Sequence, residues 1–180
     1  PKSRAPMIEK IQSEIALGRQ VFVVVPAITE GKNSEMKNIE SEIKRLKSEF
    51  KGKKILSLHG KMPQDEKDDI MRQFIAKKAN ILLSTTVIEV GVDVPNASVM
   101  VIENADRFGL SQLHQLRGRV GRGKDAAFAF LVMSSSAKPP QRLLEIEKTT
   151  DGFLLAEKDL ELRGPGEIYG KAQSGELNLE

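Results

Sequence analysis

Short apolar segments alternate with amphipathic ones through most of this chain, and this alternation constrains its fold more than any other feature. The apolar segments are residues 21–25, 54–58, 80–84, 98–102 and 126–132. A continuous apolar run of this length is typical of a strand that is buried on both faces. Because strands that alternate with helices build parallel sheets, we predict an α/β fold, a parallel sheet of about five strands with helices on both faces.

Helices are expected at residues 5–17, 34–50, 63–77 and 111–116. Gly18 stops the first, because glycine readily adopts the left-handed conformation that ends many helices, and Pro63 starts the third, where its missing N–H costs nothing. The helical period predicts inward-facing side chains in the second and third helices at Ile39, Ile43, Leu46, Ile70, Phe74 and Ile75.

The pattern changes after Met133. Residues 134–140, SSSAKPP, are typical of a linker, and the chain beyond them is helical in pattern with a turn at 149–152. We expect two short antiparallel helices around that turn and then a polar loop. The sequence thus predicts a domain at 1–133, followed by a linker, helical hairpin and loop at 134–180. The hairpin pattern alone favours a C-terminal cap on the sheet.

Composition excludes several classes of protein. With 39% hydrophobic residues the 180-residue chain can form a core, and no apolar run is long enough to cross a bilayer. The chain has no cysteine, which excludes disulfides and cysteine-ligated zinc. We expect a cytoplasmic protein without a membrane partner. The net charge is only +3, but lysine and arginine crowd residues 32–54 and 107–124, so any nucleic-acid footprint should be local.

The segment QLRGRVGR, residues 115–122, places three arginines and two glycines in eight residues. A guanidinium is permanently charged, and its fork of donors matches phosphate oxygens. Gly118 and Gly121 would let the backbone approach a ligand without a Cβ in between. A solvated basic turn is the competing interpretation of so short a run.

A second polar segment follows the apolar run at 81–83. Ser84, Thr85 and Thr86 come at the carboxyl end of the expected strand, where open parallel sheets bind ligands. Gly91 and Asp93 follow at a spacing that could place a backbone amide and a carboxylate beside a sugar or a phosphate.

These two segments resemble motifs V and VI of superfamily 2 helicases, as TTVIEVGVD at 85–93 and QLRGRVGR at 115–122. VFVVVP at 21–26 resembles motif IV, and LHGKMPQDEKDDIMRQF at 58–74 is similar to the helicase segment in which His-Gly follows a strand. The tail TTDGFLLAEKDLELRGPGEIYGKAQSG, 149–175, is similar to the translocation motif of the RecG and Mfd families, and its wording DGFLLAEKDLELRGPGE favours RecG. The chain therefore resembles the second RecA-like domain of a RecG-type helicase together with that motif.

The resemblance implies that ATP binds between two RecA-like domains. The phosphate loop and the carboxylates that hold Mg²⁺ would lie on the first of these domains, outside the present sequence. Arg119 and Arg122 match the arginine-finger positions of motif VI, and Gln115 matches the nucleotide-contacting position that opens it. Gly91 and Asp93 match the motif V residues near the ribose.

The same resemblance implies branched DNA as a partner, such as stalled forks and Holliday junctions, and a wedge domain in the same protein. Thr85 and Thr86 would contact DNA phosphates, and the His-Gly pair His59 and Gly60 supplies further candidate contacts. In the tail, Arg163 and Gln173 are predicted to couple changes in the arginine-rich segment at 115–122 to movement of DNA.

Other patterns exclude further chemistry. No G-x-x-x-x-G-K-[ST] phosphate loop occurs, so the chain by itself is expected to hydrolyse no ATP. The acidic run at 65–68 opens an expected helix, where carboxylates favour the helix dipole, and is not expected to bind metal. His59 and His114 are too isolated for zinc. Two alternatives stay open: an Mfd-type transcription-repair coupling translocase, and a non-enzymatic nucleic-acid-binding module with a RecA-like fold.

Overall fold

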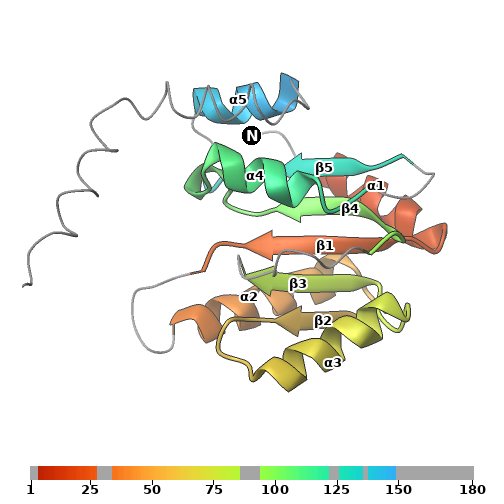
Figure 1. Cartoon of the computed structure of the whole chain (residues 1–180). Helices are drawn as coiled ribbons and strands as arrows, with labels where there is room; N and C mark the ends of the chain where they lie inside the picture. The colour runs from red at the N-terminus through yellow and green to blue at the C-terminus, as the bar shows by residue number, and fades with distance from the viewer. Residues whose placement is uncertain (1–3, 28–33, 86–93, 122–125, 136–137, 149–180) are drawn as a thin grey trace, which may run out of the picture.

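The computed structural model describes residues 4–27, 34–85, 94–121, 126–135 and 138–148. One sheet of five parallel strands forms its centre, in the order β2-β3-β1-β4-β5 (Figure 1). The strands are β1 Gln20–Val25, β2 Ile55–Leu58, β3 Ile81–Thr85, β4 Ala97–Ile102 and β5 Phe128–Leu131. The predicted α/β fold is confirmed, and the three central strands are buried along their whole length as their apolar composition requires.

Helices cover both faces of the sheet (Figure 1). The elements are α1 Ala5–Ala16, α2 Ser34–Glu49, α3 Gln64–Ile75, the 3₁₀ turn η1 Ala105–Arg107, α4 Leu110–Arg117 and α5 Gln141–Lys148. α1 and α2 pack on the face that carries Val21 and Val23, whereas α3, α4 and α5 pack on the face that carries Phe22. Side chains alternate between the faces because the strand period is two.

The helix ends follow the sequence signals closely. Gly18, just after α1, has φ +81°, and Pro63 directly precedes α3. Ile70 packs against the core, and Phe74 is buried and meets Phe22 edge to face, with ring centroids 5.2 Å apart. The inward placement of Ile75 was wrong, because its side chain is 48% exposed. Ile70 and Phe74 are four residues apart on one helix face, and the next residue is rotated by roughly 100° toward solvent.

The chain changes direction between two neighbouring strands. β1 leads through α2 to β2 on one side of the sheet, and β4 leads through η1 and α4 to β5 on the other side. β1 and β4 lie side by side, so their carboxyl ends form the topological switch point, where open α/β sheets bind ligands.

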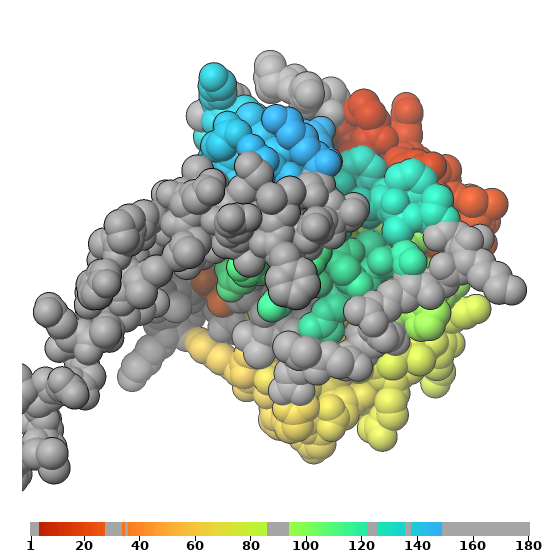
Figure 2. Space-filling model, turned by 45° about the horizontal axis from the view of Figure 1, so that its top comes forward, coloured from red at the N-terminus to blue at the C-terminus, as the bar shows by residue number. Residues whose placement is uncertain are grey.

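The C-terminal part is described as far as α5, which lies directly against the domain (Figure 2). Leu143 and Ile146 of α5 are buried in the same hydrophobic cluster as α4. The turn at 149–152, the second hairpin helix and the following loop lie outside the described residues, and the division between residues 133 and 134 stays a prediction. Within the described ranges, no helix is long and apolar enough to span a membrane.

Candidate functional site at the carboxyl edge of the sheet

Helix α4 carries the first three residues of the predicted arginine-rich segment, 115–117. Leu110, Leu113 and Leu116 are buried and attach one face of the helix to the core. Gln115 is exposed on the same helix. The backbone N–H of Arg119 donates to the Leu116 carbonyl at 3.1 Å, so the turn that carries Arg119 continues directly from α4. A helix fixed by three leucines therefore positions both candidate nucleotide contacts.

The three arginines of the segment have different surroundings. Arg117 donates through Nη1 to the carbonyl of Ile146 in α5, and its Nη2 lies 3.1 Å from His114 Nδ1. Burial lowers the pKa of Arg117. Arg119 is partly exposed, and Arg122 lies outside the described residues. Arg117 thus connects α4 to the C-terminal helix, a role that the sequence did not indicate.

The two glycines of the segment also differ. Gly121 has φ +79°, and a Cβ added there would lie 2.5 Å from the Cβ of Ala127. Gly118 has φ −69° and ψ −6°, and a Cβ there would meet only ordinary contacts at 3.5 Å with two carbonyl oxygens. Within the described residues, Gly121 is needed for a close approach to Ala127.

Two of the predicted DNA contacts lie next to each other on neighbouring strands. Leu58 of β2 pairs with Ser84 of β3, so His59 and Thr85 follow at adjacent positions. Thr85 is 1% exposed and His59 7% exposed. Thr85 Oγ1 and His59 Nδ1 are buried without a hydrogen-bond partner in the described part of the chain. Buried polar atoms are nearly always paired, so two orphans side by side mark an unusual site.

A third predicted DNA contact, Gly60, also lies among the described residues. Gly60 follows β2 and is exposed. Thr86, Gly91, Asp93, Arg163 and Gln173 lie outside the described residues. No group of three side chains suited to a metal ion occurs among the residues that the structure describes. The acidic residues Asp65 and Glu66 lie in the first turn of α3 and are exposed, as the helix-dipole interpretation predicted.

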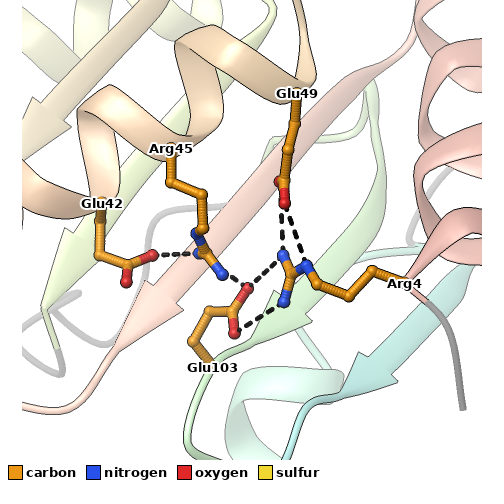
Figure 3. A network of polar contacts seen from close by, with 5 residues as sticks. All are labelled: Arg4, Glu42, Arg45, Glu49 and Glu103. Carbon is orange, nitrogen blue, oxygen red and sulfur yellow. Dashed lines mark hydrogen bonds and ion pairs between the residues drawn. The ribbon is translucent and has the colours of Figure 1, made fainter. Parts of the chain in front are cut away.

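Sequence reasoning missed a charged network at the switch point (Figure 3). Glu103 directly follows β4 and is 5% exposed. Its Oε1 accepts hydrogen bonds at 2.9 Å from Nη2 of both Arg4 and Arg45, and its Oε2 accepts one at 3.3 Å from Arg4 Nη1. Glu49 accepts from Arg4 Nε at 3.0 Å, and Glu42 accepts from Arg45. The available signal was a carboxylate directly after the apolar run of residues 99–102.

The charges of this network influence one another. Burial opposes the charge of Arg4, but the hydrogen bonds and attraction of Glu103 and Glu49 outweigh burial and raise the pKa of Arg4. Burial raises the pKa of the Glu42 carboxyl, and the neighbouring Arg45 counteracts part of that rise. The network therefore favours the charged form of Arg4 where it contacts Glu103.

A segment of seven residues, Glu103 to Gly109, links β4 to α4 and is called the connector below. Asn104 adopts a left-handed conformation with φ +50°, and Ala105 donates its N–H to the Val132 carbonyl at 2.8 Å. Asp106 accepts hydrogen bonds from the backbone N–H of Ser134, at 2.7 Å, and from its hydroxyl. Arg142 of α5 donates to the carbonyls of Asp106 and Phe108. The connector is thus held by elements on both faces of the sheet.

Comparison with known proteins identifies the class to which this arrangement belongs. Residues 6–124 match the family described as helicase conserved C-terminal domain. The chain belongs to that family.

Within the family, the chain is similar to ATP-dependent DNA helicase RecG over nearly its whole length. It is 52% identical to RecG of Synechocystis over 97% of the chain, and 50% identical to RecG of Bacillus subtilis over 92%. The chain spans 21% and 24% of those two proteins.

Solved structures agree with this assignment. The structure of RecG bound to a three-way DNA junction superposes with a TM-score of 0.74 at 44% identity, covering 93% of this chain and 22% of that one. Dbp5 of S. cerevisiae, bound to RNA and ADP BeF3, matches with a TM-score of 0.52 at 21% identity, covering 81% of this chain and 36% of that one. The second likeness concerns the fold alone, and both confirm the RecA-like architecture.

Proposed function

We propose that this chain is the second motor domain of a cytoplasmic bacterial helicase that uses ATP to unwind and regress branched DNA. The proposal rests on one observation above all. Residues 118–122, which follow α4 and are called the arginine turn below, belong to a chain that is 44% identical in sequence to a RecG solved with a three-way DNA junction. A first RecA-like domain and a wedge domain of the same protein would complete the helicase.

ATP would bind between the two motor domains, with Mg²⁺ held mainly by the first. Arg119 and Arg122 stabilise the charge that develops on the transferred phosphoryl group, because a guanidinium matches phosphate oxygens. Gln115 contacts the nucleotide from the exposed side of α4. Gly91 and Asp93 lie near the ribose.

DNA contacts would come from the ends of β2 and β3. Thr85, Thr86, His59 and Gly60 bind the phosphate backbone, and such contacts position a protein without reading sequence. His59 Nδ1 and Thr85 Oγ1, adjacent and without a hydrogen-bond partner among the described residues, support a polar site there.

The C-terminal hairpin would transmit the nucleotide state to DNA. Two observations support this role: Arg117 bonds to α5, and Arg142 of α5 bonds to the connector. Through Arg163 and Gln173, the tail beyond α5 would carry a shift of the arginine turn to the DNA.

The proposal is tested by ATP hydrolysis and unwinding on a three-way junction, measured with the full-length protein. Arg122→Ala should lower the ATP turnover at least about tenfold while leaving junction binding within about twofold, because a finger that acts on the transition state adds little to ground-state affinity. The 180-residue chain alone serves as the control and should hydrolyse no ATP. ATP hydrolysis by the isolated 180-residue chain would contradict the proposal, and so would ATP hydrolysis by the full-length protein that does not depend on DNA.

A further inference from the structure

Both carboxylate oxygens of Glu103 are engaged by arginines from α1 and α2. Arg4, at the start of α1, binds both oxygens, and Arg45 of α2 shares Oε1 (Figure 3). Each arginine is held in turn by a second glutamate, Glu49 or Glu42. The first residue after β4 is therefore fixed by two helices that are distant from it in sequence.

The place of this network in the fold is unusual. Glu103 lies at the switch point between β1 and β4, where open α/β sheets usually bind a ligand, and its N–H donates to the Val24 carbonyl of β1 at 2.9 Å. The chain's own side chains engage each other there. What leaves the switch point is the connector, and the connector leads within seven residues to α4 and the arginine turn.

Stability alone gives a weak reason for such a network. Taking five charged groups partly out of water costs about as much as their mutual attraction returns, and apolar side chains of similar size often stabilise equally well. Buried charges contribute more clearly to one specified geometry, because an ion pair with bidentate bonds tolerates little displacement. The geometry fixed here is the position and direction of the backbone where the chain leaves β4.

We propose that Glu103 is a positioning residue for the arginine turn. Held by Arg4 and Arg45, it fixes the start of the connector, and through Asn104 and η1 it sets where α4 begins and how far Arg119 reaches. This inference deepens the proposed function and rests on it for the consequence in catalysis. Glu103 itself touches no nucleotide and acts only through α4.

The test is Glu103→Gln in the full-length protein, which keeps the side-chain shape and removes the charge. Steady-state ATP hydrolysis on a three-way junction should show kcat lowered at least about tenfold, since a misplaced catalytic group costs up to about a hundredfold, with KM for ATP within about twofold. Hydrogen exchange by mass spectrometry should show faster exchange in peptides from the connector and α4. Glu103→Asp, which keeps the charge on a shorter stem, should recover part of kcat.

Two variants separate positioning from general stability. Glu49→Gln removes one negative charge from the network but leaves both arginines on Glu103, and should keep kcat within about threefold. Gln20→Ala removes a buried side chain at the amino end of β1, where it donates to the Phe74 and Ala79 carbonyls. This variant should lower the melting temperature without changing kcat or hydrogen exchange in α4.

The outcomes are distinguishable. Unchanged α4 exchange and kcat in Glu103→Gln would overturn the inference, and so would equal losses of kcat in Gln20→Ala at matched loss of stability. If the wild-type protein hydrolysed no ATP, the proposed function would fail, and α4 exchange compared with the Gln20→Ala control would still decide the positioning role.

Discussion

At the scale of single residues, the conformation of the arginine turn depends on Gly121. Its φ of +79° lies in the left-handed region, and the neighbouring Ala127 leaves no space for a Cβ. Three residues before it, Gly118 has an ordinary helical conformation, and a Cβ there would make only ordinary van der Waals contacts. The two glycines look equivalent in the sequence, but only Gly121 has a conformation and a close neighbour that disfavour any other residue. Substitution of each glycine by alanine should therefore have different effects on stability.

Gly121→Ala should destabilise the 180-residue chain by about 1–3 kcal/mol, because alanine is strained in the left-handed conformation and clashes with Ala127. Gly118→Ala is the matched control and should be neutral or stabilising by up to about 1 kcal/mol, since alanine favours the helical conformation. Urea unfolding of both variants measures the difference. Equal losses would show that the turn does not constrain Gly121.

Asp106 offers a second prediction at this scale. Partial burial opposes its charge, but the two hydrogen bonds from Ser134 outweigh burial and lower the pKa of Asp106. The ionised form therefore stabilises the fold at pH values above the unfolded pKa of 3.8, and this contribution is lost as the pH falls through the lowered folded value.

Ser134→Ala should raise the pKa of Asp106, and it should cost stability at neutral pH but less in acid. Titration of the Asp106 carboxyl by NMR checks the shift. Ser13→Ala is the control, because that hydroxyl bonds to the Lys10 carbonyl in α1 and should leave Asp106 unchanged. An unaltered Asp106 titration in Ser134→Ala would show that the Ser134 hydroxyl does not lower the pKa of Asp106.

At the scale of secondary-structure elements, Arg117 joins α4 to α5. The last four carbonyls of a helix have no partner within the helix, and Ile146 supplies one of them in α5. Arg117 donates to that carbonyl and so caps α5 from a neighbouring helix. Leu143 and Ile146 add buried apolar contacts to the same joint.

Arg117→Ala should therefore loosen α5, lowering stability by about 1–2 kcal/mol, because a partly buried carbonyl loses a charged donor. Hydrogen exchange of the α5 amides should accelerate more than exchange in α1. Gln115→Ala, on the exposed side of α4, should change stability by less than about 0.5 kcal/mol. If α5 exchanged at the wild-type rate in Arg117→Ala, the leucine and isoleucine contacts alone would hold the helix.

At the scale of the whole molecule, the connector receives contacts from nearly every layer. Glu103 binds the α1–α2 side, Asp106 binds the segment after β5, and Arg142 reaches the connector from α5. Arg117 at the end of α4 and Arg142 of α5 therefore join the arginine turn and the connector to α5 by direct contacts. Coupling of this kind needs two discrete arrangements as well as proximity.

Arg163→Ala or Gln173→Ala in the full-length protein should uncouple two activities. DNA-dependent ATP hydrolysis should persist within about threefold, whereas fork unwinding should fall at least about tenfold, because the motor would turn over without moving DNA. Parallel ATPase and strand-displacement assays on one fork substrate measure the ratio. A proportional fall in both, or no fall in either, would indicate a structural cap.

The sequence by itself determined the elements and their class. Short apolar runs flanked by polar residues favour strands buried on both faces, and the helical period of Ile39, Ile43 and Leu46 specifies which side of α2 meets the sheet. These signals are local, so they can be interpreted without knowing which elements pack together in the tertiary structure. The prediction that Ile75 faces inward was wrong because this residue follows the last inward position of α3, and periodicity is least informative at a helix end.

Only the tertiary structure decided which charged residues meet. Arg4, Arg45 and Glu103 are 41 or more residues apart along the chain, and no local pattern links them. The strand order brings them together, because β1 and β4 become neighbours only when the crossovers are made. The same applies to Arg117, whose partner in α5 lies 29 residues away. An arginine-rich motif indicates an anion site, but packing decides which arginine faces the ligand and which holds the fold.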